Sequence, residues 1–109
     1  MVASVHGFRL EFYVNEVDND AVKADILADL KTLKDANKIM RTNGNINEIT
    51  TPESIFQYVI TFDTDDGHRE EVKTAVRNKI SMLLSTGKIF NPTGRIEERL
   101  EFQIENLTF

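Results

Sequence analysis

The sequence predicts an α+β domain in which two amphipathic helices cover one face of an antiparallel sheet. Two kinds of hydrophobic spacing lead to this prediction. In three segments apolar residues alternate with polar ones, which is typical of strands that are buried on one face. In two further segments apolar residues recur every three or four positions, as they do along one side of an α-helix.

Length and composition narrow the class of protein. The chain has 109 residues, close to the commonest domain size, so one domain spanning residues 1–109 is expected. It contains no cysteine, which excludes disulfide frameworks, thiolate zinc sites and cysteine nucleophiles. The net charge of −5 disfavours non-specific binding to nucleic acid or to anionic membranes. No apolar run approaches the ~18 residues of a membrane span. The N-terminus has no secretory-signal pattern, so a cytoplasmic protein is expected.

The first strand is predicted from Phe8 to Val14, where apolar and polar side chains alternate. The first helix is predicted from Asp20 to about Asn37. Asp18 or Asn19 is its expected N-cap, because a side-chain oxygen there can accept hydrogen bonds from free backbone N–H groups. The apolar stripe of this helix consists of Val22, Ile26, Leu30 and Leu33.

The segment after the first helix contains two signals for chain reversal. Ile39 to Thr42 either extends the helix or begins a strand, and both alternatives stay open. Asn43-Gly44 predicts a turn because both residues tolerate positive φ. Ile46 to Thr50 is predicted as a short strand. Thr51-Pro52-Glu53 is predicted as a hairpin connection, since proline has no N–H to give to a strand ladder.

The strongest strand is predicted from Ile55 to Phe62, which is rich in β-branched and aromatic residues. After an acidic turn, the second helix is predicted from His68 to Ser85, with Asp66 or Gly67 as its N-cap. Gly87 suits the left-handed position just after this helix. The apolar stripe of the second helix consists of Val72, Val76, Ile80 and Leu83.

The end of the chain is predicted as a turn at Asn91–Gly94 and a final strand within Arg95–Leu107, which starts near Arg99 and alternates regularly over Arg99–Glu105. The order strand, helix, strand, strand, helix, strand resembles the split βαβ, or ferredoxin-like, arrangement at the level of element order only. The resemblance implies a four-stranded sheet in the order 4-1-3-2. The final strand and the Ile46–Thr50 strand are then its edges.

If the helices cover the apolar strand faces, the opposite face of the sheet is open and polar. Its only aromatic residue is Tyr13, and its acidic residues equal or outnumber its basic ones. RNA-recognition domains with this element order stack bases on exposed aromatic side chains, so nucleic-acid binding is not expected. The predicted open face consists of Arg9, Glu11, Tyr13, Gln57, Val59, Thr61, Arg99, Glu101, Gln103 and Glu105.

Motifs for catalysis, metals and cofactors are incomplete. Ser85–Lys88 lacks the first glycine of a phosphate-binding loop, and it ends a helix where that loop would begin one. The acids of Asp63–Gly67 fail the calcium-loop pattern, which favours a solvated turn that caps the second helix. His6 and His68 lack ligand spacing. No cofactor or metal is expected, and an enzyme is disfavoured.

The sequence therefore favours a non-enzymatic interaction module, a small accessory, viral or inhibitor-type protein that binds a protein partner or a second copy of itself. Contact is expected through the open sheet face or an edge strand. One alternative is a regulatory small-ligand-binding domain. Another is a divalent-ion-dependent hydrolase that uses the Asp63–His68 turn. The predicted partner-binding residues are Arg9, Glu11, Tyr13, Val59, Arg99, Glu101 and Glu105.

Overall fold

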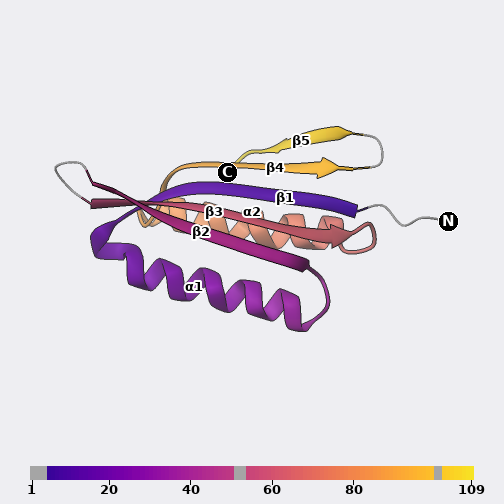
Figure 1. The fold of residues 1–109 in the computed structure, drawn as a ribbon, viewed down its shortest axis with the longest axis horizontal. Coiled ribbons are helices and arrows are strands. Elements are labelled where there is room, and N and C mark those ends of the chain that lie inside the picture. The colour runs from indigo at the N-terminus through magenta and orange to yellow at the C-terminus, as the bar shows by residue number, and fades with distance from the viewer. Residues whose placement is uncertain (1–4, 51–53, 100–101) are drawn as a thin grey trace.

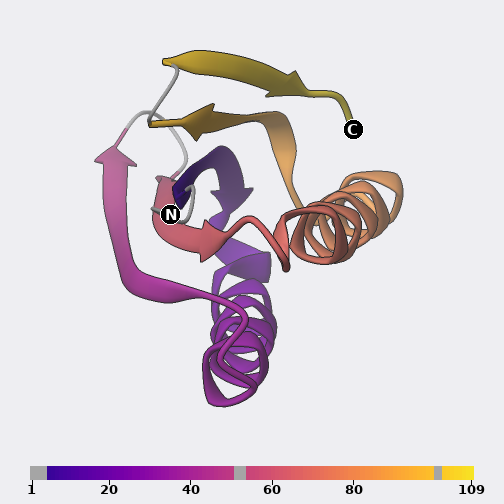
Figure 2. The same ribbon diagram turned by 90° about the vertical axis from the view of Figure 1, so that its right-hand side faces the viewer.

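The computed structural model describes residues 5–50, 54–99 and 102–109, and over these residues the chain is an α+β protein. Both helices lie on the same side of a curved antiparallel sheet, with β2 at one margin and β5 at the other (Figures 1 and 2). The elements are β1 (Val5–Asn15), α1 (Glu16–Asp35), β2 (Met40–Thr50), β3 (Ser54–Asp65), α2 (Arg69–Ser85), β4 (Phe90–Glu98) and β5 (Gln103–Leu107).

The core lies between the sheet and the two helices, as the hydrophobic spacing predicts. Every second residue of β1 from Phe8 to Val14 is buried. Phe8 stacks on Phe62 of β3 with ring centroids 4.9 Å apart, and Phe12 stacks on Tyr58 at 5.0 Å. Burial of one such side chain contributes about 1.5–3 kcal/mol. The buried helix residues are Val22 and Ile26 of α1 and Val72, Val76, Ile80 and Leu83 of α2.

The helix boundaries differ modestly from those predicted. α1 follows β1 without a connecting loop, and its N-cap is Asn15 in place of the predicted Asp18 or Asn19. Asn19 is instead engaged inside the helix, where its Oδ1 accepts a hydrogen bond from the Tyr58 hydroxyl at 2.6 Å. α2 begins at Arg69 with His68 as N-cap, and not Asp66 or Gly67. Gly87 takes the predicted left-handed conformation, with φ of +74°.

β2 is longer than predicted, and the turn prediction at Asn43-Gly44 is wrong. Both residues lie within β2, where Asn43 pairs with Thr61 and Gly44 with Ile60. The chain leaves α1 and enters β2 at Met40, which settles the Ile39–Thr42 alternatives in favour of a strand. An irregularity between Met40 and Asn43 accommodates Arg41, whose φ is +53°. The hairpin predicted at residues 51–53 lies outside the described residues.

The predicted turn at Asn91–Gly94 and the single final strand are also wrong. Asn91–Gly94 belongs to β4, which pairs with β1, and the chain reverses after Glu98 to form β5. Within the described residues the sheet thus has five strands, not four. Its order, β2-β3-β1-β4-β5, differs from the predicted 4-1-3-2 by the strand added beyond β4. An alternating pattern has the same period on both sides of a reversal, so it does not reveal one.

Candidate functional site

The open face of the sheet contains part of the predicted partner-binding set. Residues that pair across antiparallel strands share a face. Glu11 of β1 pairs with Val59 of β3, while Arg9 on the same face donates a hydrogen bond to Glu11 at 3.1 Å. Tyr13 packs edge-to-face against Phe90 of β4, with ring centroids 5.7 Å apart. The structure therefore brings Arg9, Glu11, Tyr13 and Val59 together on the face opposite the helices.

Glu105 lies on the helix side of the sheet, which corrects its predicted place on the open face. It pairs with Ile96, which pairs in turn with the core residue Phe8. Hydrogen bonds from Lys73 and then Arg69, both of α2, hold the pKa of Glu105 below its ordinary value. In β1 and β4 the even-numbered residues point toward the helices. After the reversal between β4 and β5, the odd-numbered residues of β5 point toward α2. Gln103 is on this side too, and Glu101 lies outside the described residues.

Arg99 reaches the open face by covering a buried carboxylate. Asp63 is only 4% exposed, and its Oδ1 accepts a hydrogen bond from Arg99 Nη2 at 2.6 Å. Arg41 donates to Oδ2 of the same carboxylate at 3.0 Å. The Arg99 guanidinium lies over Gly7, where a Cβ atom would be 3.0 Å from Nη2. Both arginines are therefore engaged in neutralising Asp63, since an unpaired buried charge is costly.

The other two acids of the turn before α2 also have protein partners. Asp65 Oδ1 accepts a hydrogen bond from the backbone N–H of His68 at 2.9 Å and lies 2.9 Å from His68 Nδ1. The hydrogen bond from the His68 side chain, as the largest cause, holds the pKa of Asp65 below its ordinary value. Asp66 Oδ1 lies 3.0 Å from Nε2 of the buried His6. Across the described residues there is no group of three or more side chains able to hold a metal ion.

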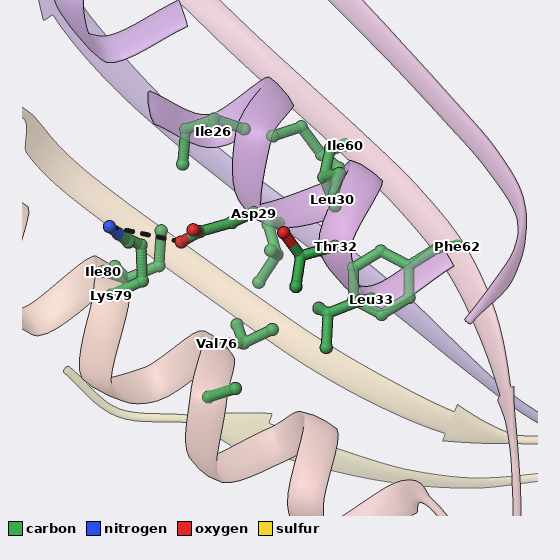
Figure 3. A pocket seen from close by; sticks show the side chains of 12 residues that line it. Ile26, Asp29, Leu30, Thr32, Leu33, Ile60, Phe62, Val76, Lys79 and Ile80 are labelled. Carbon is green, nitrogen blue, oxygen red and sulfur yellow. Dashed lines mark ion pairs between the residues drawn. The ribbon is translucent and has the colours of Figure 1, made fainter. Parts of the chain in front are cut away.

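An apolar groove of about 240 Å³ separates the two helices on the covered side of the sheet (Figure 3). Ile60 and Phe62 form part of its floor. Lys79 of α2 crosses its mouth, with Nζ 2.8 Å from Asp25 Oδ1 and 3.2 Å from Asp29 Oδ2 of α1. The hydrogen bond to Asp25, as the largest cause, raises the pKa of Lys79. The remaining apolar walls come from Leu10, Ile26, Leu30, Leu33, Ala75, Val76 and Ile80.

The outer edge of β2 is a long run of exposed residues. β2 is the last strand at its end of the strand order, and every residue from Asn43 to Ile49 is exposed. The pairing of these residues with β3 is regular, without a bulge. They include neither proline nor lysine, two of the devices by which natural sheets block their edges. This stretch offers a straight ladder of backbone groups along its outer side.

The two faces of this β2 stretch differ in chemistry. Three asparagines, Asn43, Asn45 and Asn47, point to the open face, because they pair with Thr61, Val59 and Gln57. Gly44, Ile46 and Glu48 point to the helix side, where Ile46 stays 40% exposed. A groove of about 450 Å³ lies beside the start of this stretch, lined by Leu27, Leu30, Lys31, Lys34 and Asp35 of α1 and by Thr42, Asn43 and Gly44.

The sequence predicted the Ile46–Thr50 part of this edge but missed the part before it, because Asn43-Gly44 has a strong turn preference. A usable signal was present, since Asn43, Asn45 and Asn47 continue the period-two spacing of the predicted Ile46–Thr50 strand toward its N-terminal side. The opposite edge, β5, is only 5 residues long and carries the exposed Ile104. It is tied to α2 through Glu105.

Comparison of the chain with protein-family models, with curated proteins and with solved structures finds no match. Among the described residues neither helix is apolar over a length sufficient to cross a membrane. The geometry of the β2 edge, the open face and the interhelical groove is thus the basis for a functional assignment.

Proposed function

We propose that this chain is a non-enzymatic protein-interaction module that binds an extended segment of a protein partner along the outer edge of β2. The observation that carries the proposal is the regular, exposed stretch from Asn43 to Ile49. We also propose that β1, α1, β2, β3, α2 and β4 form a ferredoxin-like core to which β5 is added.

Strand addition uses the backbone for affinity and the side chains for selection. The outward N–H and C=O groups of the stretch would pair with the added strand, at a net gain of about 0.5–1.5 kcal/mol for each hydrogen bond. On one face the added strand would meet the amides of Asn43, Asn45 and Asn47. On the other it would meet Ile46 and the apolar part of the neighbouring groove.

The open face is a secondary surface in this proposal. Arg9 is already paired with Glu11, and Arg99 with Asp63, so their charges are largely compensated inside the chain. Tyr13 and Val59 supply partly exposed contact area between these pairs. This surface would add selectivity to a partner that first engages the β2 edge.

The test uses peptides of about 12 residues selected by display on the intact protein, with hydrogen exchange of β2 amides as the readout. A selected peptide is expected to slow exchange along Asn43–Ile49. Asn45→Pro and Ile46→Pro form a matched pair. Neighbouring residues direct their N–H groups to opposite sides of a strand, so one proline removes an N–H that faces outward and the other removes an N–H that faces β3. The proline variant that keeps the wild-type melting temperature should lose the peptide. Peptide binding that leaves β2 exchange unchanged would argue against the proposal.

A small-ligand-binding domain is a second candidate, and the interhelical groove favours it. The groove is almost wholly apolar, and its polar groups are confined to the mouth, an arrangement typical of ligand pockets. An apolar fluorescent probe such as anilinonaphthalene sulfonate should bind the native protein. Ala75→Phe, which fills the groove from α2, should abolish that binding, whereas Ala28→Phe on the exposed part of α1 should not.

A further inference from the structure

We infer that the strand added to β2 is β2 of a second copy, in antiparallel pairing centred on Asn45. The inference rests on the proposed use of the β2 edge and names the partner. A two-fold axis perpendicular to the sheet keeps open face beside open face, so residues that meet across the axis lie on the same face. The axis must then pass midway between the two copies of one β2 residue, and the side chains determine which residue that is.

On the open face, the register centred on Asn45 pairs asparagine only with asparagine. Asn45 lies opposite the partner's Asn45, and Asn43 lies opposite the partner's Asn47. A primary amide both donates and accepts hydrogen bonds, so identical side chains are complementary across the axis. Alternating asparagines at an exposed edge thus provide self-recognition without any net charge.

On the helix side, the same register places a residue with a projecting side chain opposite a residue that has none. Gly44 lies opposite the partner's Ile46, and a Cβ atom at Gly44 would meet no heavy atom within 4 Å. Gly44 also lines the groove that contains Leu27, which is 56% exposed. The partner's Ile46 would therefore enter this groove and cover Leu27. The two-fold symmetry would produce the same contact in both chains.

Charges at the ends of the paired segment agree with this register. Thr42 lies opposite the partner's Glu48 and lines the groove together with Lys31 and Lys34. Within the described part of the chain Lys34 makes no ion pair, whereas Lys31 is paired with Asp35. The partner's Glu48 would supply the carboxylate that Lys34 lacks. A register centred on Ile46 would instead direct Glu48 toward Gly44 and the apolar end of the groove.

Disulfide trapping tests the register directly, because the chain has no cysteine of its own. Asn45→Cys should form an intermolecular disulfide under mild oxidation, since the two cysteines face each other. Asn47→Cys is the matched control, with the same residue type, strand and face. Its two copies would be ~13 Å apart along the strand, beyond the ~7 Å Cα separation that a disulfide bridges. A mixture of Asn43→Cys and Asn47→Cys should cross-link again. Cross-linking of Asn47→Cys alone as fast as that of Asn45→Cys, or no cross-linking of Asn45→Cys, would overturn the register.

Analytical ultracentrifugation of variants in which Glu48 and Lys34 exchange their charges tests the pairing independently of oxidation. Glu48→Lys and Lys34→Glu should each raise the dimer dissociation constant by about tenfold, because like charges then meet across the interface. The double variant should recover wild-type dimerisation. A wild type that stays monomeric, or a double variant without recovery, would contradict the inference. If the wild type is monomeric but selected peptides still protect β2 from hydrogen exchange, only the self-pairing fails and the proposed function stands.

Discussion

Arg99 Nη2 donates a hydrogen bond to Asp63 Oδ1 at 2.6 Å and thereby joins the end of β4 to the end of β3 across β1. The acceptor is buried and the donor is half exposed. This arrangement makes Asp63 dependent on its arginines, since the carboxylate has little water to replace them.

Arg99→Leu is expected to lower the free energy of unfolding by about 1–3 kcal/mol, because Asp63 then keeps only Arg41 as an arginine partner. Urea denaturation followed by circular dichroism measures the change. Arg95→Leu is the control, since Arg95 is exposed and makes no ion pair within the described residues. Its effect should stay within about 0.5 kcal/mol. Equal effects of the two substitutions would show that the Asp63 contact is energetically unimportant.

Stability should fall at low pH in part through Glu105. Its pKa is lower in the folded chain than its ordinary value of 4.5, because Lys73 and Arg69 bond to the ionised form. A lowered pKa gives stability that is present above pH 4.5 and is lost as pH falls through the folded-state value. Glu105→Gln should remove this component from a series of urea denaturations between about pH 3 and 7. Glu97→Gln, a control on the adjacent strand and the other face, should leave the component from Glu105 in place.

Gly94→Ala is expected to destabilise the protein by about 1–3 kcal/mol, since the new methyl group overfills a packed site. A Cβ atom there would lie 2.9 Å from Phe109 Cζ and 3.1 Å from Leu10 Cδ2. The thermal melting temperature is a sufficient measurement. Gly67→Ala, where the nearest atom is 3.5 Å away, should change it little. A melting temperature for Gly94→Ala at or above that of the wild type would show that Phe109 can move aside.

Tyr58→Phe removes the hydroxyl that donates to Asn19 Oδ1 at 2.6 Å while leaving the ring stacked on Phe12. The expected loss is about 1 kcal/mol, the net contribution of one hydrogen bond. Asn19→Ala should cost a similar amount. In the double variant the two losses should be less than additive, because both remove the bond to Asn19 Oδ1. Only Tyr58→Phe also removes the 3.3 Å contact of the hydroxyl with the Asn19 carbonyl oxygen. Additive losses from urea denaturation would contradict a direct contribution from this bond.

The elements predicted correctly from the sequence are those in which the spacing of apolar residues alone shows which face is buried. Burial alternates in β1 from Val5 to Val14 and in β3 from Gln57 to Phe62, and both helices have continuous apolar stripes. The errors fall where local turn preference competes with pairing to a neighbouring strand. Asn43-Gly44 in β2 and Asn91–Gly94 in β4 both favour turns in isolation. Asn43 and Gly44 are nevertheless paired with β3, and Thr93 and Gly94 are paired with β1 beyond an irregularity at Asn91 and Pro92.

The site was harder to predict because its contacts join distant parts of the chain. Asp63 meets Arg99 across 36 positions, and Glu105 meets Lys73 across 32. Alternation correctly assigned Arg9, Glu11, Tyr13 and Val59 to one face, since strand parity determines it. It misplaced Glu105 because an unrecognised reversal between β4 and β5 exchanged odd and even positions.

The two edges of the sheet are unequal, and in the proposed pairing through β2 this inequality would limit the size of the assembly. β2 offers an edge that is regularly paired from Asn43 to Ile49, whereas β5 is short and held to α2 by Glu105. When two chains join through β2, the only margins left to the combined sheet are two copies of β5. Growth would then stop at the pair instead of continuing into a fibre, although the joining contact is made by backbone groups that any strand could match.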